Sequence, residues 1–295
     1  RDHAGEGREE VHGTDVFHVA AHSDPNFIQK FGFQIDSLVE KCVACHPEDT
    51  SALRLAGTYY YSTGRPDKSR DYVKKNRDLH PDVLSARALY VQLLSLTEDW
   101  ETMITESDDA FKQFPEEMAF MEYKNMAYYN LEDYRKVIEV SEEIIRLAPS
   151  DSAAVLSAYS SIGDMYHQLG ESKKAYAAYD KAMKINPEYA PVLNNYAYYL
   201  SVEGRNLSKA AKMSAKAIAA EPENATYLDT YGWILFKQKK YERAKEIFKR
   251  VLIHGGNGSP EVLDHYAAVL DALGESALAE GYRQQAAIKR NGSKK

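Results

Sequence analysis

The stretch LSAYSSIGDMYHQLGESKKAYAAYDKAMKINP, Leu156 to Pro187, contains the pattern that decides the fold. Apolar, aromatic and small residues stand in it at defined positions: Tyr159, Ile162, Gly163, Tyr166, Ala175, Tyr179, Ala182 and Pro187. The small Gly163 and Ala175 allow two helices to approach each other closely, and the larger side chains fill the space around them. Pro187 ends the second helix, because proline lacks an N–H group and disfavours helix at the preceding residue. The stretch therefore predicts a pair of packed helices.

Helix-ending prolines recur along the chain with a nearly constant period. Steps of 34 residues separate the first four, steps of 38 and 35 follow, and a glycine continues the series after another 34: Pro47, Pro81, Pro115, Pro149, Pro187, Pro222 and Gly256. A period of 34 residues is characteristic of the tetratricopeptide repeat (TPR). The longest step holds extra residues within SDSAAVLS, which predicts a longer first helix or a wider loop at that point.

The chain resembles the TPR family over about four-fifths of its length. The consensus positions return in other stretches, as in Leu53, Gly57 and Tyr60 and again in Leu228, Gly232 and Leu235. The resemblance implies an all-α fold, a right-handed superhelical α-solenoid of about seven TPR helix-turn-helix repeats with an N-terminal helical cap. We expect residues 1–13 to be a flexible segment, 14–49 a helical cap or partial repeat, 50–290 the TPR array and 291–295 a flexible tail.

Composition and charge argue against several classes of protein. The net charge of −7 over 295 residues does not suit the neutralisation of nucleic-acid phosphates. No segment reaches the ~18 consecutive apolar residues of a membrane helix. The two cysteines are too few for the disulfide framework of a small secreted domain. We therefore expect no nucleic acid among the partners and no membrane-spanning segment.

The string EKCVACHP, residues 40–47, contains the C-x-x-C-H pattern of c-type haem attachment. Repeat position offers another explanation, because Cys42 falls at the small-residue position that Ala182 occupies in a later repeat. The following His-Pro is a helix stop that recurs at residues 80–81. A zinc site is a further alternative, with ligands drawn from Cys42, Cys45, His46, His18 and His22. We expect neither cofactor nor metal, and haem or metal binding through Cys42, Cys45 and His46 stands as the alternative.

The concave groove of a TPR array is the expected place for a partner, and the first helix of each repeat lines it. The resemblance implies a set of groove-facing side chains in the C-terminal half: Asp164, His167, Asn194, Tyr198, Asp229, Trp233, Phe236, Asp264 and Asp271. Carboxylates beside aromatic rings favour an extended segment that carries Lys or Arg, through ion pairs and cation–π contacts. Asn194 could hold the peptide backbone through its side-chain amide. The alternative is that the acidic residues are only solvated surface.

These observations favour a non-enzymatic scaffold or adaptor that binds a protein or peptide in its groove. No nucleophile elbow, Walker A loop or HExxH motif occurs, so we expect no catalytic activity. The strings LNNYAYYLS, ATYLDTYGWILF and EVLDHYAAVL resemble TPR proteins of bacterial cell envelopes, which implies an envelope assembly and a periplasmic location. The chain begins with Arg rather than Met, so we expect a processed or shortened product, and a cytoplasmic location is the alternative.

A self-associating structural array is the other hypothesis for its function. The last expected helix, residues 277–290, carries Leu278, Tyr282 and Ile288, and no polar capping helix follows it. Solenoid ends without a polar cap tend to pack on a neighbour. The chain could therefore form a homo-oligomer through its solenoid ends.

Overall fold

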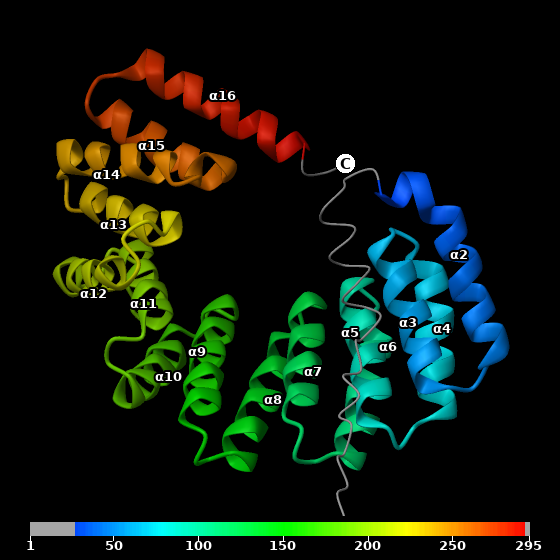
Figure 1. Cartoon of the computed structure of the whole chain (residues 1–295). Helices are drawn as coiled ribbons and strands as arrows, with labels where there is room; N and C mark the ends of the chain where they lie inside the picture. The colour runs from blue at the N-terminus through cyan, green and yellow to red at the C-terminus, as the bar shows by residue number, and fades with distance from the viewer. Residues whose placement is uncertain (1–26, 293–295) are drawn as a thin grey trace, which may run out of the picture. The chain divides into compact units, whose positions relative to one another are not determined.

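The computed structural model describes residues 27–292, and every regular element in this range is helical (Figure 1). The chain divides into two compact units, one up to Glu132 and one from Asp133. The predicted flexible segment 1–13 and the first part of the predicted cap, residues 14–26 with His18 and His22, lie outside the described residues. The all-α prediction is confirmed for the described range.

The first unit consists of helices packed against their sequence neighbours, with apolar residues between them. Its helices are α2 (Phe27–Cys45), α3 (Thr50–Ser62), α4 (Pro66–Leu79), α5 (Leu84–Leu96), α6 (Trp100–Gln113) and α7 (Ala119–Asn130). In α2, Ile35, Val39 and Val43 are buried at a spacing of four residues, so they form one face that packs against α3. The part of the predicted cap that is described is therefore a helix.

The second unit contains the remaining helices, which Figure 1 shows following one another in sequence order. They are α8 (Tyr134–Leu147), α9 (Ser152–Gln168), α10 (Ser172–Ile185), α11 (Ala190–Val202), α12 (Leu207–Ala220), α13 (Ala225–Lys237), α14 (Tyr241–Ile253), the short 3-10 helix η1 (Gly256–Gly258), α15 (Pro260–Ala272) and α16 (Ser276–Gly292). α16 continues two residues past the predicted end of the array, because residues 291 and 292 extend its last turn. The flexible tail from residue 291 stays a prediction.

Close packing within each repeat follows the small-residue pattern. Tyr179 of α10 is fully buried and lies so near Gly163 of α9 that a Cβ there would come within 2.6 Å of Tyr179 Cδ1. The paired helices α9 and α10, α11 and α12, α13 and α14, and α15 and α16 pack against each other. The expected pairing of first and second helices is therefore present throughout the second unit from α9 onward.

A side-chain cap sets the start of α9. Asp151 Oδ1 accepts hydrogen bonds from the backbone N–H groups of Ala153 and Ala154, both at 3.0 Å, and so satisfies two unpaired donors at the start of α9. α9 has 17 residues, whereas α11, α13 and α15 have 13 each. The extra residues of the longest repeat step therefore lengthen the first helix of that repeat. This was one of the two predicted possibilities, the other being a wider loop.

The boundary between the units falls inside a predicted repeat. The third repeat was expected to comprise the helices now seen as α7 and α8, but α7 belongs to the first unit and α8 to the second. Asn125 stands in α7 at the repeat position that Gly57, Gly163 and Gly232 hold in the sharper repeats. The second unit thus begins with α8, which packs against α9.

Candidate functional site

An aromatic–acidic cluster joins the first helices of three successive repeats in the second unit. We define it as Tyr198 of α11, Asp229 and Trp233 of α13, and Glu261 and His265 of α15. The Tyr198 hydroxyl donates a hydrogen bond to Glu261 Oε1 at 2.9 Å. His265 Nδ1 lies 3.0 Å from Asp229 Oδ1, and His265 Nε2 lies 3.9 Å from Glu261 Oε1. The cluster is therefore one connected network that spans three repeats.

Trp233 forms the aromatic centre of this cluster. Its ring stacks on the His265 ring at a centroid distance of 4.0 Å and on Phe236 at 4.8 Å, with interplanar angles of 17° and 13°. Lys237 Nζ lies 4.7 Å from the Trp233 ring centroid. The side chain is half-buried, so part of a large apolar surface is open to solvent. Half-buried tryptophans of this kind are frequent anchors in protein interfaces.

Helix geometry explains why α13 presents these side chains together. Residues 229, 233 and 236 are spaced i, i+4 and i+7, so they share one face of the helix. Asn224 starts the helix by accepting hydrogen bonds from the N–H groups of Thr226 and Tyr227. Gly232 is placed where a Cβ would lie 2.8 Å from Phe248 Cε2, and this close approach fixes α13 against α14. The close contact at Gly232 thus fixes the position of α13 beside the face that carries the cluster.

The electrostatics of the cluster differ from one carboxylate to the next. Asp229 and His265 are each 8% exposed. The His265 imidazole lies within hydrogen-bond distance of the Asp229 carboxylate, so this carboxylate already has a partner. Glu261 keeps 64% of its side chain exposed. Burial, followed by the neighbouring Glu261 carboxylate, raises the pKa of Tyr198, so its hydroxyl remains a hydrogen-bond donor at neutral pH. Glu261 is therefore the carboxylate of this cluster that remains open to a ligand.

Asp164 belongs to a separate network between α9, α10 and α11. Its carboxylate accepts hydrogen bonds from the Tyr179 hydroxyl and from Asn195 Nδ2, the latter at 3.0 Å. Burial raises the pKa of Asp164, and the two hydrogen bonds oppose this rise. Asp164 is thus largely occupied by its own neighbours.

Two other predicted groove residues also serve the packing between repeats. Asn194 is 4% exposed, and its Nδ2 donates to Asn195 Oδ1 at 3.3 Å, so it is not available to a peptide backbone. His167 stacks on Tyr199 at a centroid distance of 3.3 Å, and burial lowers the pKa of His167. The neutral imidazole is therefore the favoured form in this stack. The expectation that Asn194 binds peptide conflicts with its burial.

The carboxylates of α15 outside the cluster are paired with arginines of α16. Asp264 forms an ion pair with Arg290, and Asp271 forms one with Arg283. Each arginine lies on α16, the second helix of the same repeat, so both ion pairs connect the two helices of one repeat. The structure therefore assigns Asp264 and Asp271 to internal ion pairs rather than to a row of open groove carboxylates.

Two residues of the cluster were missed by the sequence reasoning. Glu261 and His265 lie within the string EVLDHYAAVL, but only the aspartate positions of α15 were singled out there. Their spacing of four residues places them on one helix face, which was the available signal. Their contacts with Asp229 and Tyr198 come from helices 36 and 63 residues away in sequence and needed the tertiary structure.

The Cys42–Cys45 region shows no metal geometry in the part of the chain that is described. Cys42 is half-buried and Cys45 is exposed. No three His, Cys, Asp or Glu side chains between residues 27 and 292 come together as a metal site would require. Ala182 and Ala217 are fully buried, whereas Cys42 is not, so its match to their repeat position holds only in part. Between the same limits, no helix has the length and apolar composition needed to cross a membrane.

Comparisons with known proteins agree with the repeat pattern. Residues 157–261 match the family model described as the cytochrome c-type biogenesis protein H TPR domain. The type IV pilus assembly protein PilF of Pseudomonas aeruginosa is 33% identical over 87 residues, which cover 30% of this chain and 34% of PilF. The human protein O-mannosyl-transferase TMTC1 is 20% identical over 196 residues, 64% of this chain and 21% of that protein.

A solved structure shows the same fold. The crystal structure of a tetratricopeptide repeat protein from Parabacteroides merdae superimposes with a TM-score of 0.63 at 14% identity and covers 81% of this chain and 93% of its own. The chain spans only 21% and 34% of the lengths of the two relatives above. The fold is thus a TPR α-solenoid, an architecture that presents surfaces for protein–protein interaction.

Proposed function

Because this chain is a tetratricopeptide-repeat protein, we propose that it is a non-enzymatic scaffold that binds a segment of a partner protein at the aromatic–acidic cluster. The observation that carries this proposal is the connection of Tyr198, Trp233 and Glu261 across three first helices. A surface assembled from several repeats can follow an extended segment along its length. The cluster thus supplies an anchor and a charge within one rigid patch.

The chemistry of the cluster narrows the partner. Glu261 is the exposed carboxylate, so a Lys or Arg of the partner would pair with it. An apolar side chain next to that residue would pack on the open part of Trp233 and on Phe236. The sequence analysis expected several acidic residues to face the groove. Asp264 and Asp271 already have arginine partners, so Glu261 is the one carboxylate that we assign to partner binding.

The relatives favour a setting in a bacterial envelope assembly. The stretch that matches the cytochrome c-type biogenesis protein H TPR domain contains Tyr198, Asp229, Trp233 and Glu261. A second relative is named as a type IV pilus assembly protein. We therefore propose a periplasmic or envelope-associated adaptor, with a cytoplasmic adaptor as the alternative.

Site-specific photo-crosslinking tests the proposal. A photoreactive amino acid at position 233 is expected to crosslink one protein from envelope fractions of the native cell, and the same group at position 33 is not. Phe33 is the matched control, since it is 86% exposed on α2 in the first unit. Glu261→Lys should abolish the crosslink, whereas Asp264→Asn should preserve it. Equal crosslinking from positions 233 and 33, or no effect of Glu261→Lys, would refute this site.

A self-associating array is the second candidate, and exposed apolar residues on α16 favour it. Leu278 is 48% exposed and Ile288 is 71% exposed on this last helix. Sedimentation velocity over a range of concentrations measures the association state directly. If the chain forms dimers, Ile288→Glu should return it to a monomer, because the new charge would have to be buried in the interface.

A further inference from the structure

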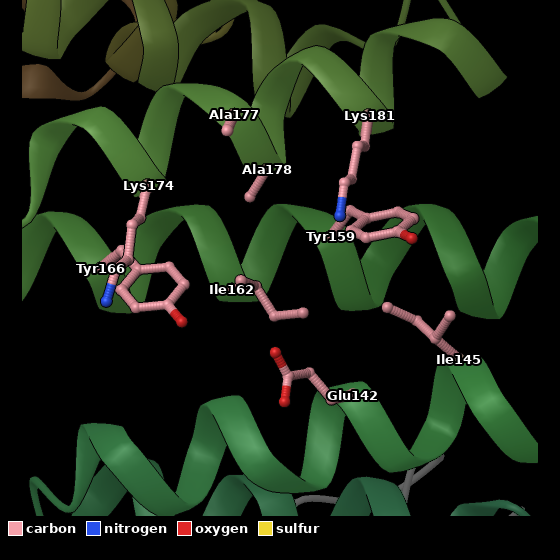
Figure 2. A pocket seen from close by; sticks show the side chains of 9 residues that line it. All are labelled: Glu142, Ile145, Tyr159, Ile162, Tyr166, Lys174, Ala177, Ala178 and Lys181. Carbon is pink, nitrogen blue, oxygen red and sulfur yellow. The ribbon is translucent and has the colours of Figure 1, made fainter.

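A cleft of about 300 Å³ lies between α8, α9 and α10 of the second unit, on a different face of α9 from Asp164 and His167. Figure 2 shows its composition: Ile162 of α9 lies at the centre, and Ile145 of α8 and Ala178 of α10 complete the apolar wall. The volume is large enough for one branched aliphatic or aromatic side chain. The cleft can therefore accommodate a single side chain of a partner.

Short side chains on α10 leave the cleft open. α9 is the first helix with the extra residues, and the side of α10 that faces the cleft carries only alanines, Ala177 and Ala178, between two lysines. Alanine methyl groups do not reach across to α8. The recess thus follows from local sequence and is not a gap between the two units.

Two lysine–tyrosine pairs border the cleft. Lys174 Nζ lies 5.1 Å from the Tyr166 ring centroid, and Lys181 Nζ lies 5.1 Å from that of Tyr159. Figure 2 shows both amines directed from α10 toward these rings. The lysines are seven residues apart, which places them two helical turns or about 10 Å from each other on one face of α10. The two charges therefore have a defined spacing.

The two lysines at the cleft differ in their ion pairing. Lys174 pairs with Glu171 at 2.6 Å, but none of the ion pairs among the described residues involves Lys181 or Glu142. α10 carries four lysines against one aspartate. The α10 side of the cleft thus carries an excess of positive charge, which favours an acidic side chain of a partner.

Glu142 of α8 places a negative charge on one side of the cleft, across from the positive charges of α10. It lines the cleft on the side opposite the two lysines, and Figure 2 shows its carboxylate turned toward Ile162. A uniformly anionic surface, such as a phosphate or lipid headgroup layer, would meet this carboxylate unfavourably. A segment with acidic residues only along α10 and an apolar residue between them would avoid that repulsion.

We propose that the α8–α10 cleft binds an acidic amphipathic helix of a partner protein. One apolar side chain enters between Ile145 and Ile162. One acidic side chain pairs with Lys181, and a second, seven residues away, replaces Glu171 as the partner of Lys174. Positions i, i+3 and i+7 of a helix lie on one face, so a single peptide helix can supply all three groups. This site is separate from the aromatic–acidic cluster and would serve a second partner or a second region of the same partner.

A designed peptide provides the probe. It is a fluorescein-labelled, alanine-based helix with one leucine and with glutamates three residues before and four residues after it. Binding to the full chain is measured by fluorescence anisotropy at physiological ionic strength. Saturable binding is expected, and replacing the leucine with serine should weaken it at least about tenfold, because the cleft would then bury a polar group.

Matched variants identify the site. Lys174→Glu combined with Lys181→Glu should raise the Kd at least about tenfold, whereas Lys173→Glu with Lys184→Glu should raise it less than about threefold, although both pairs change the charge of α10 equally. Ala177→Phe fills the cleft without a change of charge and should also block binding. Since Ala177 is exposed, circular dichroism is expected to show unchanged helicity in this variant.

Several results would overturn the proposal. Equal weakening by the two lysine pairs would mean attraction by net charge alone, and tight binding of the serine peptide would exclude the apolar recess. Lysine-dependent binding to phosphatidylserine vesicles without binding of the peptide would assign the surface to a membrane. Trp233→Ala is expected to leave peptide binding unchanged, so failure at this site is distinguishable from failure of the aromatic–acidic cluster.

Discussion

Tyr198 of α11 and Glu261 of α15 are joined by a hydrogen bond of 2.9 Å although 63 residues separate them in sequence. The bond skips one whole repeat, the one formed by α13 and α14. Tyr198 and His265 both approach the Glu261 carboxylate, so its position depends on two helices. The geometry of the proposed binding surface thus depends on contacts between repeats as well as on contacts within single helices.

The Tyr198–Glu261 bond is expected to show a measurable coupling energy. In a double-mutant cycle of Tyr198→Phe and Glu261→Gln, we expect a coupling of about 0.5 kcal/mol in the free energy of unfolding, at the low end for hydrogen bonds because Glu261 is exposed. Urea denaturation of the four proteins measures it. Strict additivity of the two single changes would show that the bond is not formed in solution.

Asp164 should make stability depend on pH in a defined direction. Burial raises its pKa in the folded state, so the folded state favours the protonated acid. The resulting stabilisation is present below the unfolded pKa of about 3.9 and is lost as the pH rises through the raised folded pKa. Asp164→Asn removes this titration.

The stability of Asp164→Asn relative to the unmodified chain should therefore increase between pH 4 and pH 7. Denaturant unfolding at pH 4, 5.5 and 7 measures the difference, in which the contributions of all other titrating groups cancel. A difference that is the same at all three pH values would show that the folded environment does not favour the protonated acid.

Gly232 is expected to tolerate no side chain. An added Cβ would lie 2.8 Å from Phe248 Cε2 and 3.3 Å from Ile247 Cγ2, and Phe248 is fully buried. Gly232→Ala should lower the free energy of unfolding by about 1–3 kcal/mol through overpacking. Gly281→Ala in α16 is the matched control, because nothing lies within 4 Å of its added Cβ.

Thermal and urea unfolding of both glycine variants separates packing from helix propensity. Gly281→Ala should be stabilised by up to about 1 kcal/mol, since alanine favours the helix. If Gly232→Ala were stabilised to the same extent, the close approach of α13 and α14 would be absent.

Asn76 in α4 is a buried polar residue whose replacement should stabilise the first unit. Its side chain is fully buried, and neither Oδ1 nor Nδ2 has a hydrogen-bond partner among the described residues. Asn76→Ala should raise the free energy of unfolding by up to about 1 kcal/mol, because the desolvation cost of both groups is removed. Ala110 occupies the equivalent repeat position in α6 and is also fully buried.

Asn76→Asp provides the opposite change at the same site. It would bury a carboxylate and should destabilise the protein strongly at neutral pH. Chemical denaturation of the two variants checks both signs. A loss of stability in Asn76→Ala would indicate that the amide has a partner in solution, such as a buried water.

Much of the fold was accessible from the sequence because TPR packing is local. Each repeat buries its small and aromatic positions against its neighbours, so the 34-residue period already specifies which helices meet. Gly163 and Tyr179 illustrate this, since their spacing predicts the close approach that the structure shows. The division between Glu132 and Asp133 was not anticipated, because the repeat period continues across it.

The candidate site was accessible only in part. Repeat register selected Tyr198, Asp229 and Trp233, which are linked through Glu261 and His265, but it also selected Asp264 and Asp271, which pair with arginines. The repeat register predicts which face of a helix a residue lies on, but it does not predict which side chain a charged residue pairs with. Arg283 and Arg290 on the following helix have long side chains that contact Asp271 and Asp264. The repeat period does not predict these contacts.

The sequence by itself determined the helices, their order and their pairing, because these depend on spacing within about 34 residues. The tertiary structure alone decided which carboxylates stay open, since that depends on contacts between side chains far apart in the chain. Glu261 remains exposed beside Tyr198, whereas Asp229 is buried against His265. The physical reason is that a charge loses its freedom to bind when another helix desolvates it or pairs with it.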